Sequence, residues 1–134
     1  MLKLVVALVL VAHGIGHSMG ILGAFKVATI NPVWQGDSWI LGDLVGSGAS
    51  QTIGTVLWAL AIVGFVMLGA VVMGWLPAAW WQPLAIGSSV VSLLGVLLFP
   101  IAFPAFSTFG AVAVDLAVLV ATLWYGWTPS DLTA

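Results

Sequence analysis

The residues Ala12–Ala24, AHGIGHSMGILGA, guide the interpretation of the whole chain. They lie within an apolar run from residue 2 to residue 25, about 24 residues, which is long enough for a helix to cross a hydrocarbon core of about 30 Å. His13 and His17, the only histidines, are four residues apart and therefore share one helix face. Small residues recur at the same spacing beside them: Ala12, Gly16, Gly20 and Ala24. The run predicts a membrane helix with one small, polar face.

The composition of the chain also indicates a membrane environment. Of 134 residues, 63% are hydrophobic and 4% are charged, and the mean hydropathy is +1.27. Soluble domains carry roughly 25% charged residues, so we expect the lipid bilayer to be the solvent here. A formal net charge of -2 offers no basic patch for nucleic acid. The chain has no cysteine, which excludes disulfides, zinc–thiolate sites and iron–sulfur clusters.

Hydropathy and turn residues divide the chain into four expected spans. They cover about 2–25, 52–75, 83–99 and 107–127, within a single domain over 1–134. The polar loop 26–51 joins the first two spans. Within it, Asp37 or Ser38 can cap a short apolar helix, which we expect to lie on the membrane surface. Helices this apolar with short connections favour an all-α, up-down, four-helix integral membrane bundle.

An even number of spans places both termini on the same side of the membrane. Lys3 and Lys26 flank the first span at opposite ends, so the positive-inside rule does not decide the orientation. We expect the acidic loop 26–51 to be exported and both termini to be cytoplasmic. The four-span layout is shared by several small bacterial membrane families, and it predicts a multi-pass protein of a bacterial inner membrane.

Asp115 is the one acidic residue expected deep within a span. It lies near the middle of the fourth span, at the depth of His13 in an antiparallel bundle. An ionisable group there costs at least about 2.5–3.5 kcal/mol, so it faces protein or water and usually has a partner. His13 and His17 are the other ionisable groups near that depth. The sequence therefore predicts a buried cluster of His13, His17 and Asp115.

Four interpretations of this cluster remain open. It can be a latch that fixes helix pairing, a metal site with His13 and His17 as ligands, a haem or chlorin site with an axial histidine, or a proton relay. The latch is our first interpretation, and it predicts an accessory or scaffold subunit. The relay favours a proton or small-ion channel or carrier, and the cofactor sites favour an electron-transfer protein. We expect that the protein binds no cofactor, and the alternative is that it binds haem or chlorin.

Small residues predict where helices approach closely. Besides the stripe in the first span, the third span carries Ser88, Ser92 and Gly95. We expect such glycine-rich faces to pack within the chain, in a homo-oligomer or in a larger membrane complex. Catalysis is not expected. The His13–His17 pair lacks the glutamate of a metalloprotease helix, and Ser18 diverges from His17 by about 100° around the helix.

Overall fold

The structure is a computed structural model that describes residues 1–132, and it is built from helices. The helices are α1 (Leu2–Gly16), α2 (Ser18–Ala24), α3 (Leu41–Val45), α4 (Ser47–Val72), α5 (Trp81–Leu98) and α6 (Ala105–Leu123), with 3₁₀ turns η1 (Ala78–Trp80) and η2 (Pro129–Leu132). Four stretches are long and apolar enough to cross a membrane: Leu2–Ala24, Ser47–Val72, Ala78–Leu98 and Ala105–Leu123. The predicted all-α, four-helix up-down bundle with a short helix in the first loop is confirmed.

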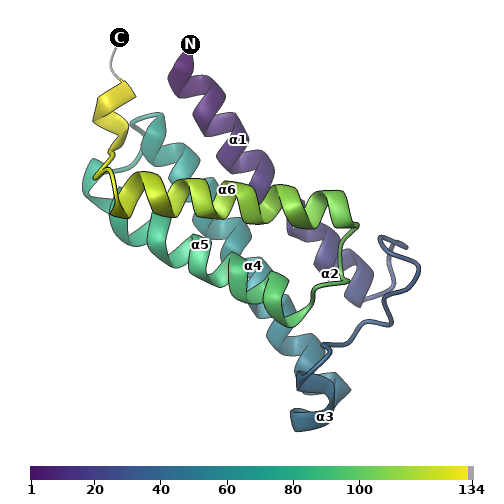
Figure 1. Cartoon of the computed structure of the whole chain (residues 1–134). Helices are drawn as coiled ribbons and strands as arrows, with labels where there is room; N and C mark the ends of the chain where they lie inside the picture. The colour runs from purple at the N-terminus through teal and green to yellow at the C-terminus, as the bar shows by residue number, and fades with distance from the viewer. Residues whose placement is uncertain (133–134) are drawn as a thin grey trace.

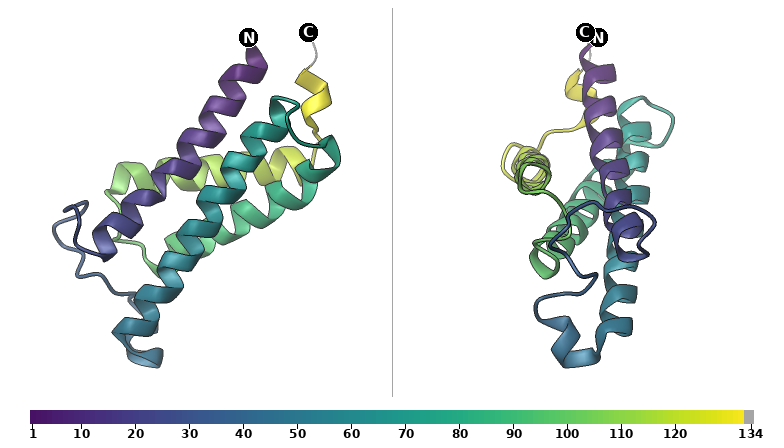
Figure 2. Two further views of the ribbon diagram at one scale, coloured as in Figure 1. Left: turned by 180° about the vertical axis from the view of Figure 1, so that it is seen from behind. Right: turned by 90° about the vertical axis from the view of Figure 1, so that its right-hand side faces the viewer.

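Helix α4 is the centre of the bundle. α1 and α2 pack along it, α5 packs beside it, and α6 packs mainly against α5. In Figures 1 and 2, α6 crosses α1 at a steep angle instead of running alongside it. The start of α1 and the turn η2, near the two termini, lie at one end of the molecule, and α3 lies at the other. We call these the termini end and the loop end.

The apolar core is divided into two clusters, one toward each end. The cluster toward the termini end comprises Ala7, Leu10, Phe65, Leu68, Val71, Val72, Trp81, Ala85 and Val118. The cluster toward the loop end comprises Ala24, Trp34, Trp58, Phe99, Ala102 and Phe103. Along the first span, His13 and His17 lie between Leu10 of one cluster and Ala24 of the other. Ser92 likewise lies between Ala85 and Phe99 along the chain. A polar layer therefore separates two apolar ones.

Several helix ends differ from the predicted spans, and glycines mark the differences. α4 begins at Ser47, earlier than the expected residue 52, because Gly46 (φ +85°) turns the chain directly from α3 into α4. α6 ends at Leu123, before the expected residue 127, and Gly126 (φ +60°) reverses the chain. A positive φ is readily available only to glycine. The second turn brings Trp127 against Trp81, with ring centroids 4.9 Å apart.

The first loop folds back onto the bundle. Trp34 is buried and packs edge-to-face on Trp58, with ring centroids 5.8 Å apart. The Ser38 hydroxyl donates a hydrogen bond to the Leu98 carbonyl at 2.6 Å. It also accepts one from the Leu41 amide at 3.2 Å, which caps the first turn of α3. These contacts cover the loop end of the bundle.

Candidate functional site

The first span is interrupted at His17. α1 ends at Gly16 and α2 begins at Ser18. The His17 amide donates to the Gly14 carbonyl, and the Gly20 amide donates to the His17 carbonyl, each at 3.1 Å. These are i to i+3 bonds, as in a 3₁₀ turn, which winds more tightly than an α-helix and often marks a functional position when it occurs within one. His17 is 3% exposed, so its side chain lies inside the bundle.

Four side chains from three spans form a continuous network, which we call the His–Asp network: His13, His17, Ser92 and Asp115. His13 Nε2 lies 2.9 Å from Asp115 Oδ1. The Ser92 hydroxyl donates to Asp115 Oδ2 at 2.5 Å and lies 2.9 Å from His17 Nε2. Asp115 is fully buried. The structure therefore brings together all three residues of the predicted cluster, with His13 in direct contact with the acid and His17 connected to it through Ser92.

Ser92 is the member of the network whose role the sequence did not reveal. We expected it to be a small residue for helix packing. Serine hydroxyls within helices commonly bond to their own backbone, so the residue type alone carries little information about a side-chain contact. The available signal was depth, because Ser92 lies within the third span at the level that an antiparallel partner of Asp115 would occupy.

The hydrogen-bond directions follow from counting protons. With Asp115 ionised, Ser92 gives its single hydroxyl proton to Oδ2. Ser92 Oγ then accepts from His17, so Nε2 of His17 carries the ring proton. In a neutral imidazole the other nitrogen, Nδ1, is an acceptor. His17 Nδ1 is buried and has no hydrogen-bond partner among the described residues 1–132.

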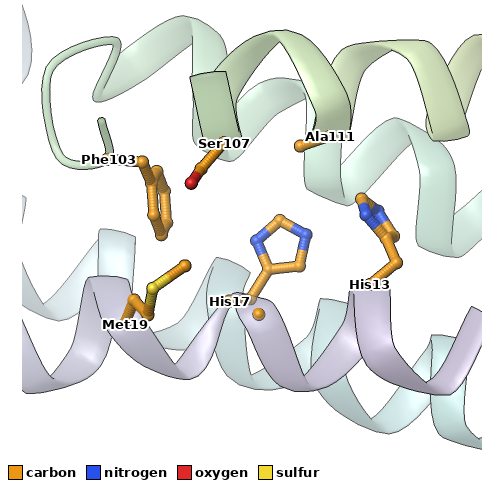
Figure 3. A pocket seen from close by; sticks show the side chains of 7 residues that line it. His13, His17, Met19, Phe103, Ser107 and Ala111 are labelled. Carbon is orange, nitrogen blue, oxygen red and sulfur yellow. The ribbon is translucent and has the colours of Figure 1, made fainter. Parts of the chain in front are cut away.

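A pocket adjoins both imidazoles on the side of α6, and we call it the imidazole pocket (Figure 3). Its volume is about 160 Å³, and its lining residues are His13, Gly16, His17, Met19, Phe103, Ser107 and Ala111. Figure 3 shows the His17 ring with one nitrogen toward His13 and the other toward Ser107 and Phe103. This second nitrogen is Nδ1, because it is bonded to Cγ, the ring atom that is joined to Cβ. Because Ser107 and Phe103 belong to the loop end, the pocket lies in that half of the molecule.

The residues predicted to pack helices lie in different environments. Gly20 and Ala24 are buried, as are Ser88, Ser92 and Gly95 on α5. Ala12 is exposed, and a Cβ placed on Gly16 would meet nothing within 4 Å. A close contact of α1 with α4 instead uses Gly14, where an added Cβ would lie 2.8 Å from Phe65 Cβ. Gly14 belongs to the quoted stretch but not to the predicted stripe.

The geometry around the histidines bears on the metal and tetrapyrrole alternatives. No group of three or more His, Cys, Asp or Glu side chains within residues 1–132 is arranged as a metal site. The two rings are nearly perpendicular, with centroids 5.1 Å apart, and both Nε2 atoms already have hydrogen-bond partners. The imidazole pocket, at about 160 Å³, is close in volume to a cavity that holds one benzene ring.

Comparisons with family models, with curated proteins and with solved structures find no match to this chain. Two features of the site bear on its function: a hydrogen-bonded chain between two histidines and an acid, and a pocket at one end of that chain.

Proposed function

We propose that this protein carries protons across the membrane and that the His–Asp network is the buried part of their path. The supporting observation is the continuous hydrogen-bonded chain from His17 through Ser92 to Asp115 and His13, in a layer between two apolar clusters. Histidine is suited to exchanging protons near neutral pH, and ionisable residues within membrane spans commonly mark proton pathways.

The proposed transfer within the network balances without moving any of its heavy atoms. A proton arrives at His17 Nδ1, a buried acceptor with no partner among residues 1–132, once the Ser107 or Phe103 side chain that covers it rotates aside. Nε2 of the same ring gives its proton to Ser92 Oγ, while Ser92 gives its own proton to Asp115 Oδ2. One proton has entered at the imidazole pocket, and one now rests on the acid. The distances of 2.9 Å and 2.5 Å along this route are hydrogen-bond distances.

Further polar atoms lie on the far side of the network, toward the termini end. Ser89 Oγ, Thr122 Oγ1 and Trp81 Nε1 are buried and have no hydrogen-bond partner among residues 1–132. Ser89 and Trp81 precede Ser92 on α5, and Thr122 is two turns beyond Asp115 on α6. Buried polar atoms normally have partners, so unpaired ones call for an explanation. In this proposal the Ser89 and Thr122 hydroxyl oxygens accept hydrogen bonds from a proton leaving Asp115, whereas the Trp81 indole N–H can only donate one.

Proton flux into liposomes tests the proposal. The purified protein is reconstituted with a pH-sensitive dye inside, and a potassium diffusion potential drives protons. We expect flux from the wild type and its loss in Asp115→Asn. Asp131→Asn, which changes an exposed acid outside the spans, is the matched control and is expected to keep the flux. Absence of flux from folded wild-type protein, or equal flux in Asp115→Asn, would reject the relay.

A second candidate is the accessory or scaffold subunit, and one observation favours it. α6 has few contacts with α1, and the His13–Asp115 ion pair joins the two helices. In that case the His–Asp network is a latch that holds α6 in place for a partner, in a homo-oligomer or a larger complex. Asp115→Asn would then change the size of the complex extracted from native membranes, while neither wild type nor variant conducts protons.

A further inference from the structure

The imidazole pocket combines apolar walls with one unsatisfied acceptor. Met19, Phe103 and Ala111 supply apolar surface, and Gly16 leaves open space. The polar groups in the lining are the two imidazoles and the Ser107 hydroxyl. His17 is only 3% exposed. Its Nδ1 atom, which faces Ser107 and Phe103, has no hydrogen-bond partner among residues 1–132 (Figure 3).

We infer that the imidazole pocket binds a small neutral aromatic ring that carries a hydroxyl group, that is, a phenol-type molecule drawn from the membrane phase. The inference deepens the proposed function, because it places this molecule at the relay's entry atom, His17 Nδ1. It rests on that function only for the further expectation that the bound molecule slows proton flux.

The volume of the pocket suits a single ring. At about 160 Å³ it is close to the volume of a cavity that accepts benzene. Methionine sulfur makes favourable contacts with aromatic rings, and Phe103 can pack edge-to-face on a second ring.

The hydrogen-bond pattern favours a ligand that can donate a hydrogen bond to His17 Nδ1. Nδ1 is an acceptor in the state in which Ser92 donates to Asp115. A hydroxyl on the ring satisfies this buried nitrogen, whereas benzene and its halogenated derivatives leave it unpaired. Nδ1 is covered, so the hydroxyl reaches it once the Ser107 side chain or the Phe103 ring rotates aside. Both residues line the pocket and lie outside the His–Asp network.

Fluorine NMR on the full chain in lipid nanodiscs tests the inference. 4-Fluorophenol and fluorobenzene are titrated against wild type, with empty nanodiscs correcting for partition into lipid. We expect saturable binding of 4-fluorophenol, about tenfold tighter than that of fluorobenzene, as one hydrogen bond to a buried acceptor gives. Equal affinity for the two probes, or no saturable binding of either, would overturn the inference.

Two glycine variants locate the site without changing any residue of the His–Asp network. Gly16→Leu directs a side chain into the open space of the pocket and is expected to abolish 4-fluorophenol binding. Gly110→Leu, on α6 outside the pocket, also adds a side chain where nothing lies within 4 Å, and it is expected to keep the wild-type affinity. Retained binding in Gly16→Leu would place the ligand elsewhere and reject the inference.

The binding measurement and the flux measurement test the binding site and the relay separately. Preferential 4-fluorophenol binding by protein that conducts no protons would reject the relay and leave the binding site standing. Proton flux without 4-fluorophenol binding would reject the binding site and leave the relay standing. Where both hold, saturating 4-fluorophenol is expected to reduce wild-type flux several-fold and to leave flux through Gly16→Leu unchanged relative to its own ligand-free value.

Discussion

A serine hydroxyl has one proton, and Ser92 uses it on Asp115 while accepting from His17. This single residue therefore joins two groups that do not touch each other, at 2.9 Å from His17 Nε2 and 2.5 Å from Asp115 Oδ2. Ser89, one turn earlier on the same helix, is equally buried and has no partner for its hydroxyl. The two serines form a natural pair for comparison.

Ser92→Ala is expected to destabilise the fold, because it leaves His17 Nε2 and one oxygen of Asp115 buried without a partner. Orphaned buried groups of this kind cost about 1–3 kcal/mol. Ser89→Ala removes a hydroxyl that bonds to nothing, so its free energy of unfolding should match or exceed that of wild type. Unfolding by SDS in mixed micelles, followed by circular dichroism, measures both. Equal stability of the two variants would contradict the hydrogen bonds assigned to Ser92.

Asp37, in the first loop, provides a prediction about pH. Hydrogen bonds from the Ser50 and Ser47 hydroxyls, with the Ser38 amide, hold the pKa of Asp37 below its ordinary value. A group with a lowered pKa stabilises the folded loop above the ordinary pKa, and this contribution is lost as pH falls through the lowered one. Ser50→Ala should therefore raise the pKa of Asp37 toward its ordinary value, as measured by ¹³C titration of the carboxyl group. Ser130→Ala, far along the chain, should leave it unchanged.

At the scale of the helices, the sequence predicted where each span lies along the chain better than which face of each helix points into the bundle. Hydropathy was sufficient for the four spans, because each is apolar over its whole length. The same uniformity hid which side of each helix faces inward, so the predicted stripe includes exposed Ala12 and buried Gly20 alike, and omits Gly14. The meeting of His13 with Asp115 could be predicted because so few ionisable groups lie within the spans.

Other features of the site depend on local geometry that hydropathy does not encode. The 3₁₀ turn at His17 has no proline to announce it, and the glycines around it, Gly14, Gly16 and Gly20, equally indicate close helix packing in a membrane span. Trp34 is buried against Trp58 although a tryptophan in a polar loop is typical of the membrane interface. Phe103 and Ser107 reach the imidazole pocket because α6 crosses α1 steeply, and this angle follows from packing of the whole bundle.

Two glycines in the first span test this account of helix rotation. A Cβ on Gly20 would lie 2.7 Å from two Trp58 ring atoms and 2.9 Å from Phe103, so Gly20→Ala should destabilise the fold by about 1–3 kcal/mol through overpacking. Gly16 has open space at the same position, and Gly16→Ala should be neutral or stabilising by up to about 1 kcal/mol, since alanine favours helix. SDS unfolding of the pair measures the difference. Comparable losses in both would mean that the first span is rotated differently.

For the whole molecule, the arrangement of the two ends defines how the site meets the membrane surfaces. The start of α1 and the turn η2 share one end, and the first loop and α3 form the other. The imidazole pocket lies in the half toward the loop end, and the unpaired Ser89, Thr122 and Trp81 lie toward the termini end. If the loop end faces outward, as the acidic loop led us to propose, protons enter the network from outside.

The absence of cysteine allows this orientation to be measured directly, because any introduced thiol is the only one. Thr29→Cys lies in the first loop, Ala79→Cys in the turn before α5 and Ser130→Cys near the C-terminus, and all three positions are exposed. In intact bacterial spheroplasts expressing the protein, a membrane-impermeant maleimide should label Thr29→Cys alone. The other two should react only after the membrane is permeabilised. Labelling of Ala79→Cys and Ser130→Cys from outside, with Thr29→Cys protected, would reverse the orientation while keeping the four spans. Labelling of Ala79→Cys and Ser130→Cys from opposite sides would break the four-span topology itself, since both positions belong to the same end of the molecule.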